Sequence, residues 1–403
     1  MNNFTFYAPT KVVFGKGTES QVGALVAAQN CKKVLLHYGS GSVKKTGLLD
    51  RVKKSLDESG ISYVELGGVV PNPRLSLVRE GIALCKKEGV DFLLAVGGGS
   101  VIDSAKAIGY GCANDFDVWD IFERKNQPKA CLPVGVVLTI AAAGSEMSNS
   151  AVITNEDGWK KRGSNSDTCR PKFAIMNPEL TMTLPEYQTM CGSTDILMHT
   201  MERYFTSQGN MELTDSIAEG LMRTVISNTK ILLKNPKDYD ARAEIMWASS
   251  LSHNDLTGLG NGGNDFASHR LEHELGGMFD VAHGAGLAAS GEAGPAMFTR
   301  NVCIDLRNLP LMSGMFRSPV LMKKLPSKES RLWRISTGKS KCLRICGNSE
   351  LHRRTSRLTS LPKSVQSQQA VMSEVRKSFM KMTCGRFSLQ RNKCRVGCEQ
   401  SNT

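Results

Sequence analysis

The chain has 403 residues, enough for two domains and a sizeable core. Its formal net charge of +13 would by itself suggest a nucleic-acid or membrane-surface partner. However, residues 290–403 hold 22 Lys and Arg against 6 Asp and Glu, whereas residues 1–289 hold 29 against 32. The basic character therefore belongs to the last quarter of the chain, and the rest gives no reason to expect a nucleic-acid partner.

Neither a leader sequence nor a membrane span is predicted. The start, "MNNFTFYAPTKVVFG", lacks the charged beginning and apolar core of a signal peptide, and no apolar run approaches the roughly 18 residues of a membrane span. Six of the 12 cysteines precede position 290, and neither group has zinc-finger spacing. We therefore expect reduced thiols, a cytoplasmic location and no contact with a membrane.

The first part of the chain alternates short apolar strands with helix-like segments. "KKVLLHYGSGS" is a strand and a Gly/Ser turn, and residues 43–60 follow with helical spacing. The order recurs in "SYVELGG" before residues 71–89 and in "DFLLAVGGGS" before "VIDSAKAIGYG". This alternation predicts a parallel sheet with crossover helices, so residues 1–184 are predicted to be an α/β dinucleotide-binding domain.

A second, all-α domain is predicted over residues 185–289. Apolar residues recur at three- and four-residue intervals in segments 186–207 and 210–235, as they do in amphipathic helices. Residues 290–403 have no sustained periodicity and are predicted to be irregular.

A glycine turn lies between a predicted strand and a predicted helix. Gly97, Gly98 and Gly99, followed by Ser100, let the backbone approach a pyrophosphate, whose charge the helix N-terminus favours. Because the motif is not GxGxxG, a tight turn without a ligand explains it equally well. Asp103, one turn into the helix, either accepts from a ribose or amide of the cofactor or simply faces the helix dipole.

An earlier strand ends in a second cluster, formed by Gly39, Ser40, Gly41 and Ser42. Sites that prefer NAD often carry an acidic residue at such a strand end, where it holds the ribose hydroxyl. Here no acidic residue is present and two lysines follow, which leaves space and positive charge for a 2′-phosphate. The cluster favours NADP(H) over NAD, although each lysine alone is equally well explained as a solvated helix residue.

Histidines and one carboxylate in the helical part have the spacing of metal ligands. Asp195 and His199 stand four residues apart, which places both on one helix face, and His269 and His273 repeat that spacing before His283. One carboxylate with three imidazoles suits Fe(II) or Zn(II) and leaves a position for a substrate oxygen.

Each pair alone also fits a polar helix face or a core histidine with satisfied hydrogen bonds. Spacing does not choose between His269 and His273 as the ligand. His253 has no partner at helical spacing and is assigned to the surface or the core.

These segments together resemble the iron-containing alcohol dehydrogenase family, in particular its NADP(H)-dependent butanol dehydrogenase and aldehyde reductase branch. The matching stretches follow in order over nearly all of residues 1–289: "PTKVVFGKG", "YGSGSVKKTGLLD", "PNPRLSLVREG", "AVGGGSVIDSAKAIG", "LTIAAAGSEMSNSAVITN", "NPELTMTLPEYQT", "DILMHTMERYF" and "SHRLEHELGGMFDVAHGAGLA".

The resemblance implies a dehydroquinate synthase-like fold and hydride transfer between NADP(H), or alternatively NAD(H), and a small alcohol or aldehyde. It also implies a homodimer. The resemblance assigns the metal to Asp195, His199, His269 and His283, and places His273 near the nicotinamide, in a position for proton transfer. It places Gly97, Gly98, Gly99 and Ser100 at the pyrophosphate, with Thr139 and Ser145 beside the cofactor.

The family pattern stops after Ala289, where relatives continue with a segment similar to "IWGSWARYVYK" and this chain has "SGEAGPAMFTR". Codons for residues 290–300 can be chosen so that a reading frame shifted by one nucleotide encodes that family segment. A shifted reading of residues 329–366 also gives an acidic, helix-like string, and near the C-terminus it meets a stop codon. We therefore predict that residues 290–403 arise from a one-nucleotide deletion, which truncates the helical domain and impairs folding or activity.

Two other interpretations fit features of the chain. One is a glycerol-dehydrogenase-like polyol enzyme of the same superfamily. The other is a non-catalytic product whose basic tail binds acidic partners non-specifically. The tail has neither interleaved aromatic residues nor a recognised nucleic-acid-binding module, so no specific nucleic-acid partner is expected.

Overall fold

The computed structural model describes residues 1–206, 209–263 and 266–291. The predicted frameshifted tail from position 292 onward lies outside the described residues. All of the described residues belong to one compact unit of the chain.

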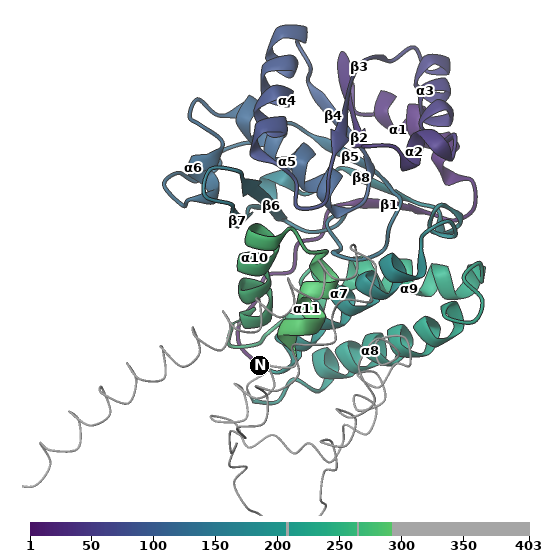
Figure 1. Cartoon of the computed structure of the whole chain (residues 1–403), viewed down its shortest axis with the longest axis vertical. Coiled ribbons are helices and arrows are strands. Elements are labelled where there is room, and N and C mark those ends of the chain that lie inside the picture. The colour runs from purple at the N-terminus through teal and green to yellow at the C-terminus, as the bar shows by residue number, and fades with distance from the viewer. Residues whose placement is uncertain (207–208, 264–265, 292–403) are drawn as a thin grey trace, which may run out of the picture. The chain divides into compact units, whose positions relative to one another are not determined.

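A six-stranded parallel sheet forms the centre of the N-terminal part, in the order β1-β8-β5-β4-β2-β3 (Figure 1). Its strands are β1 (Lys11–Phe14), β2 (Lys33–Gly39), β3 (Ser62–Val69), β4 (Phe92–Gly97), β5 (Val134–Leu138) and β8 (Phe173–Met176). Every residue of β4 and β5 is buried, as expected for parallel strands covered on both faces. The predicted parallel α/β arrangement is confirmed.

Helices cover both faces of this sheet, and the alternation of side chains along β2 divides the core. Val34 and Leu36 pack with residues of α1 (Val22–Ala27) and α3 (Leu48–Glu58), whereas Leu35 packs with residues of α4 (Leu75–Glu88) and α5 (Gly99–Ala113). Residues 43–60 do not form one helix as predicted, because Gly47 has a φ of 67° between α2 (Ser42–Lys45) and α3. A left-handed residue interrupts the helical hydrogen bonding.

An antiparallel hairpin, which the sequence analysis did not anticipate, is formed by β6 (Ser150–Asn155) and β7 (Lys160–Asn165). It follows the short helix α6 (Trp119–Phe122) and β5 in the chain. One strand of the hairpin contacts α5 and the other contacts α10 (Ala267–Phe279). The hairpin therefore connects the sheet region to the helical region.

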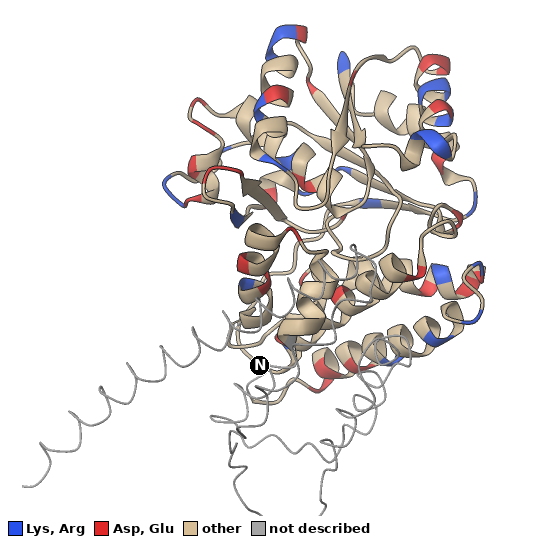
Figure 2. Cartoon of the chain, in the orientation of Figure 1, with Lys and Arg blue, Asp and Glu red and all other residues tan. Residues whose placement is uncertain are grey.

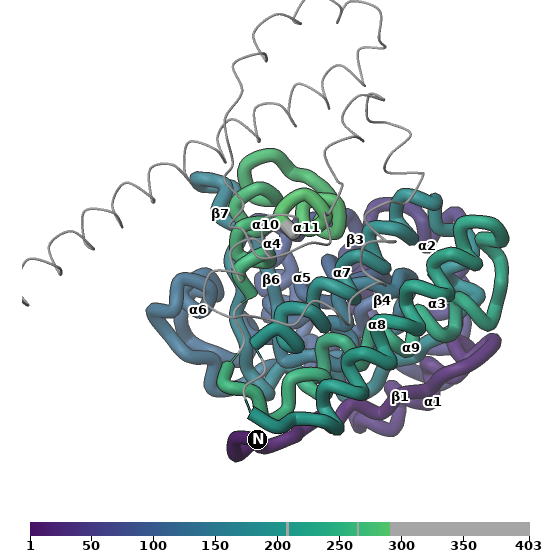
Figure 3. The backbone as a smooth tube through the Cα atoms, turned by 90° about the horizontal axis from the view of Figure 1, so that it is seen from below, coloured from purple at the N-terminus to yellow at the C-terminus, as the bar shows by residue number. Residues whose placement is uncertain are grey.

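The C-terminal part is helical, as predicted. It comprises α7 (Glu186–Tyr204), α8 (Glu212–Leu232), α9 (Tyr239–His253), α10 and α11 (His283–Gly291), and Figure 3 shows α10 and α11 side by side. The predicted start of the irregular tail, residue 290, is slightly too early, because Ser290 still belongs to α11. The Ser290 hydroxyl is buried and lies 3.3 Å from the carbonyl oxygen of Ser268.

Charged residues of both signs are interspersed over the described elements (Figure 2). This agrees with the near balance of basic and acidic residues before position 290. Among the described helices, none is long and apolar enough to cross a membrane.

Candidate metal centre and cofactor cleft

Helix α7 carries two of the predicted metal ligands. Asp195 and His199 are 2% and 4% exposed, and their four-residue spacing puts both on the face that turns away from solvent. The His199 Nδ1 donates a hydrogen bond to the backbone carbonyl oxygen of Asp195 at 3.1 Å. It lies equally close, 3.1 Å, to the Asp195 Oδ1.

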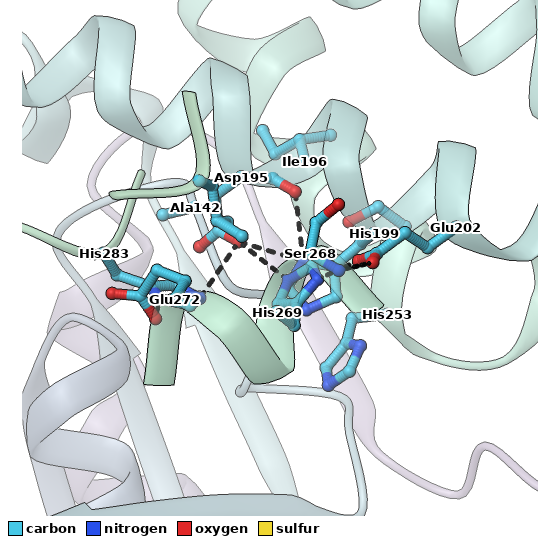
Figure 4. Close-up of polar contacts among 12 residues, drawn as sticks. Ala142, Asp195, Ile196, His199, Glu202, His253, Ser268, His269, Glu272 and His283 are labelled. Atoms are coloured by element: carbon cyan, nitrogen blue, oxygen red, sulfur yellow. Dashed lines mark hydrogen bonds and ion pairs between the residues drawn. The ribbon is translucent and has the colours of Figure 1, made fainter. Parts of the chain in front are cut away.

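Helices α10 and α11 bring two further histidines to the same oxygen. The Nε2 atoms of His269 and His283 each lie 3.6 Å from the Oδ1 of Asp195 (Figure 4). Helix α11 can approach α7 this closely because residue 284 is glycine: a Cβ there would lie 2.1 Å from the carbonyl oxygen of Cys191. Local sequence thus permits the close contact that places His283 beside Asp195.

The geometry and hydrogen bonding of this cluster fit a divalent cation. Potential ligand atoms of Asp195, His199 and His269 all lie within 4.8 Å of one another. His283 is outside that group and joins it through Asp195. The buried Oδ1 of Asp195 and Nε2 of His269 have no hydrogen-bond partner, which is costly unless another group satisfies them. Carboxylate and imidazole ligands suit iron or zinc.

The electrostatics of the cluster follow from its mixture of carboxylates and imidazoles. Burial acts to raise the pKa of Asp195, but the charges of His283 and His199 beside it lower it well below 3.8. Burial acts to lower the pKa of His269, but the adjacent carboxylates of Asp195 and Glu202 raise it to about 9. The site therefore favours a carboxylate with positive charge beside it.

A cleft of about 1390 Å³ extends from this cluster to the N-terminus of α5. All four proposed ligands line it. The other predicted site residues that line it are Gly98, Gly99, Ser100, Asp103, Ser145 and His273. The remaining predicted residues, Gly39, Ser40, Gly41, Ser42, Gly97 and Thr139, do not line it directly.

The predicted strand–turn–helix around the glycines is present, since β4 ends at Gly97 and α5 begins at Gly99. Packing also contributes to the need for glycine here: a Cβ at Gly98 would lie 2.0 Å from the Ile140 side chain. The backbone N–H of Thr139 donates to the carbonyl oxygen of Gly97 at 3.1 Å, which ties β5 to this turn. Contact of these residues with a pyrophosphate stays a prediction.

Asp103 already has protein partners on both carboxylate oxygens. Its Oδ1 accepts from the Ser145 hydroxyl at 2.5 Å and its Oδ2 from the backbone N–H of Val152 at 3.0 Å. Asp103 therefore fixes the segment around Ser145 and the start of β6, and any contact with a ribose or amide would be additional to these bonds.

The Gly39–Ser42 cluster adjoins the cleft without lining it. Gly39 pairs with Val69, which does line the cleft, across strands β2 and β3. The Lys44 ammonium lies over the ring of Tyr38, 5.1 Å from its centroid. Lys44 is exposed and contacts an aromatic ring at this strand end.

His253, which the sequence analysis leaves to the surface or the core, is half-buried and lies beside the cluster. Its ring centroid lies 4.1 Å from that of His199, and it lines the cleft. The Arg203 guanidinium donates to the Nδ1 of His253 at 3.0 Å, which leaves the ring proton on Nε2. Its partners are 50 and 54 residues away in sequence, and so no local spacing indicates them.

Two buried glutamates were also missed. Glu202 contacts the Nδ1 of His269, and Glu272 contacts the Nδ1 of His283. Glu202 follows His199 by three residues on α7, so helical spacing could have indicated it. Glu272 lies between two histidines of α10 and carries no comparable signal.

Comparison with known proteins identifies the family. Residues 9–178 match the iron-containing alcohol dehydrogenase family, and residues 189–290 match the C-terminal part of the same family. The chain belongs to the iron-containing alcohol dehydrogenase family, in the branch of the butanol dehydrogenases and the aldehyde reductase YqhD. The predicted family resemblance is confirmed.

Relatives and solved structures agree over the same region. The chain is 43% identical over 288 residues to the probable NADH-dependent butanol dehydrogenase 1 of Bacillus subtilis, covering 72% of this chain and 74% of the relative. It is 39% identical over 292 residues to the NADPH-dependent aldehyde reductase YqhD of Escherichia coli, covering 72% and 74%. The crystal structure of NADH-dependent butanol dehydrogenase A from Thermotoga maritima has a TM-score of 0.70 and 45% identity over 72% of each chain.

The family match ends at residue 290. About a quarter of each of these relatives lies outside the aligned region. The position of this end agrees with the point at which the sequence loses its family pattern, although the cause of the change stays a prediction.

Proposed function

We propose that this chain is an alcohol dehydrogenase and aldehyde reductase that uses NADP(H) and Fe(II) or Zn(II). The observation that carries the proposal is the convergence of histidines from α7, α10 and α11 on the single oxygen Oδ1 of Asp195, at the side of a cleft that reaches the α5 N-terminus. Asp195, His199, His269 and His283 would hold the cation. That cation supplies a Lewis acid that polarises the substrate oxygen during hydride transfer.

The residues of the cleft have distinct roles in this proposal. Gly98, Gly99 and Ser100 bind the pyrophosphate with the backbone amides of the α5 N-terminus. Asp103 and its partner Ser145 hold the adjacent loop against the cofactor. Their position in the same cleft as the cation supports these roles.

His273 is proposed to stand near the nicotinamide and to relay the substrate proton. It lies one helical turn after His269 on α10 and lines the same cleft, with its ring centroid 6.0 Å from that of His283. It is thus near the proposed cation without sharing the oxygen of Asp195.

The preference for NADP(H) is supported by the strand end at Gly39. No acidic side chain stands there, and Lys44 lies nearby over Tyr38. Relatives with both preferences are known, since the Bacillus subtilis protein is named NADH-dependent and the Escherichia coli protein NADPH-dependent. We also propose a cytoplasmic location and a homodimer, in line with the family.

The altered C-terminal region is proposed to impair this activity, because the family's remaining segment is replaced from about residue 290 onward. The test is to compare the full chain with a version in which one nucleotide restores the reading frame before codon 290. We expect the restored chain to give higher soluble yield and faster NADPH-dependent reduction of butanal. Equal yield and rate in both would refute the impairment, and no reduction of butanal or other small aldehydes by either would refute the activity.

A further inference from the structure

Glu202 is a residue of α7 whose side chain faces the start of α10, and it is 2% exposed. Its Oε1 accepts a hydrogen bond from the backbone N–H of Ser268 at 2.6 Å, and its Oε2 contacts the Nδ1 of His269 (Figure 4). Both carboxylate oxygens are therefore engaged with α10, and Glu202 is not itself part of the cluster of possible ligands.

The contact with Glu202 decides which nitrogen of His269 carries a proton. A carboxylate only accepts, so the Nδ1 of His269 is the donor. The Nε2 on the other side of the ring faces Asp195 and has no hydrogen-bond partner. An imidazole nitrogen binds a cation only when it carries no proton, so the Nδ1 proton is what leaves Nε2 available.

We propose that Glu202 is a positioning residue that keeps the ring proton of His269 on Nδ1, so that Nε2 can bind the cation. This role rests on the metal centre of the proposed function. Glu202 lies on α7 together with Asp195 and His199, and it contacts His269 on α10. It therefore ties the α10 ligand to the helix that carries the other two.

The same arrangement occurs a second time in the centre. Glu272 is fully buried, and its Oε2 contacts the Nδ1 of His283, whose Nε2 faces the same oxygen of Asp195. Lys161 on β7 donates to the two oxygens of Glu272 at 3.2 and 2.9 Å. Two histidines from different helices thus approach Asp195 with the same nitrogen, each held from behind by a glutamate.

Replacement of Glu202 by glutamine should move the ring proton of His269 to the nitrogen that faces the cation. The backbone N–H of Ser268 requires an acceptor, so the amide oxygen of the glutamine would face Ser268 and its NH2 would face His269. That NH2 donates, so Nδ1 would have to accept and the ring proton would move to Nε2, where it blocks the cation. Glu202→Ala removes the constraint without imposing the wrong tautomer. We therefore expect Glu202→Gln to bind the cation more weakly than Glu202→Ala, against the usual order for a conservative change.

The experiment measures Zn²⁺ affinity of the full chain by competition with a chelator. We expect Glu202→Ala to weaken binding about 10-fold and Glu202→Gln about 100-fold. The matched control is Glu274→Gln, because Glu274 is an exposed residue of α10 whose partner is Arg162, and it should leave the affinity unchanged. Long-range ¹⁵N spectra of the histidines in the zinc-loaded wild-type chain should show a proton on Nδ1 of His269.

The outcomes separate this role from the proposed function. If the wild-type chain binds no divalent cation, the metal centre fails and this role fails with it. If it binds zinc but Glu202→Gln binds as well as Glu202→Ala or better, only the role of Glu202 is overturned. Glu272→Ala provides a second test in case the Glu202 variants do not fold, and it should weaken zinc binding about 10-fold, because the Nδ1 of His283 then loses its acceptor. An unchanged affinity in that variant would count against the proposal.

Discussion

The ammonium nitrogen of Lys106 lies 2.7 Å from the backbone carbonyl oxygen of Ser145, inside a fully buried site. The same nitrogen donates to the carbonyl oxygens of Ser148 and Ser150 at 2.9 and 2.8 Å. One lysine on α5 therefore holds three backbone acceptors of the segment that lines the cleft beside Asp103.

Replacing Lys106 by methionine should leave these buried carbonyl oxygens without donors. Because each such group costs about 1–3 kcal/mol, we expect Lys106→Met to lower the free energy of unfolding by at least about 3 kcal/mol and to weaken NADPH binding. Urea unfolding and fluorescence titration measure the two effects. Lys54→Met is the control, since the side chain of Lys54 is 76% exposed. If Lys106→Met changes the unfolding free energy and the NADPH affinity as little as the control does, the hydrogen bonds of Lys106 are not needed for either.

Removal of the central carboxylate should abolish metal-dependent activity. In Asp195→Ala the histidine nitrogens lose the oxygen on which they converge, and we expect kcat/KM for aldehyde reduction to fall at least about 100-fold because the ion contributes several kcal/mol. The metal content of the purified variant, measured by elemental analysis, should fall in parallel. Asp240→Ala, at the exposed start of α9, serves as the control. Full activity of Asp195→Ala after chelator treatment would exclude this metal centre.

The buried His37 on β2 should make the stability of the fold depend on pH. Its Nδ1 donates to the Leu66 carbonyl oxygen and its Nε2 accepts from the Ser104 hydroxyl, so the folded protein holds a neutral ring. Burial lowers the pKa of His37 from 6.5 to about 4. The contribution is therefore present above pH 6.5 and is lost as the pH falls toward 4, because only the unfolded chain binds the proton in this range.

The difference in pKa corresponds to about 3 kcal/mol once the pH is below both values, and to about 2 kcal/mol at about pH 5. His37→Gln keeps a donor and an acceptor but does not titrate, so its unfolding free energy should fall less between about pH 7.5 and about pH 5. Urea unfolding at the two pH values measures the difference. If the unfolding free energies of wild type and variant fall equally between the two pH values, the lowered pKa of His37 is contradicted.

The preference for NADP(H) should depend on the absence of a carboxylate at Gly39. A Cβ there would lie 3.6 Å from the Val69 carbonyl oxygen, an ordinary contact, so a side chain fits. Gly39→Asp would repel a 2′-phosphate and accept from a ribose hydroxyl, so we expect KM for NADPH to rise at least about tenfold relative to KM for NADH. Gly39→Ala, which adds only the methyl group, should leave this ratio nearly unchanged. A wild-type chain that already prefers NADH would refute the proposed preference.

Periodicity and spacing in the sequence determined the parallel α/β part, the helical part and the glycine turn at the α5 N-terminus. They also determined that Asp195 and His199 share a face, because a four-residue separation on one helix fixes their relative direction whatever the helix packs against. These features depend on neighbours within a few residues, and so they can be read locally.

Tertiary packing decided what spacing had left open. His269 and His273 lie one turn apart on α10, yet only the Nε2 of His269 faces Asp195, because the rotation of α10 against α7 and α11 is set by side-chain packing. Packing also brings the Arg203 guanidinium within 3.0 Å of the His253 Nδ1, a contact that no sequence spacing indicates. The resemblance to a known family selected the proposed ligands. The groups that orient His269 and His283 contact them across helices or strands, and only the folded structure shows these contacts.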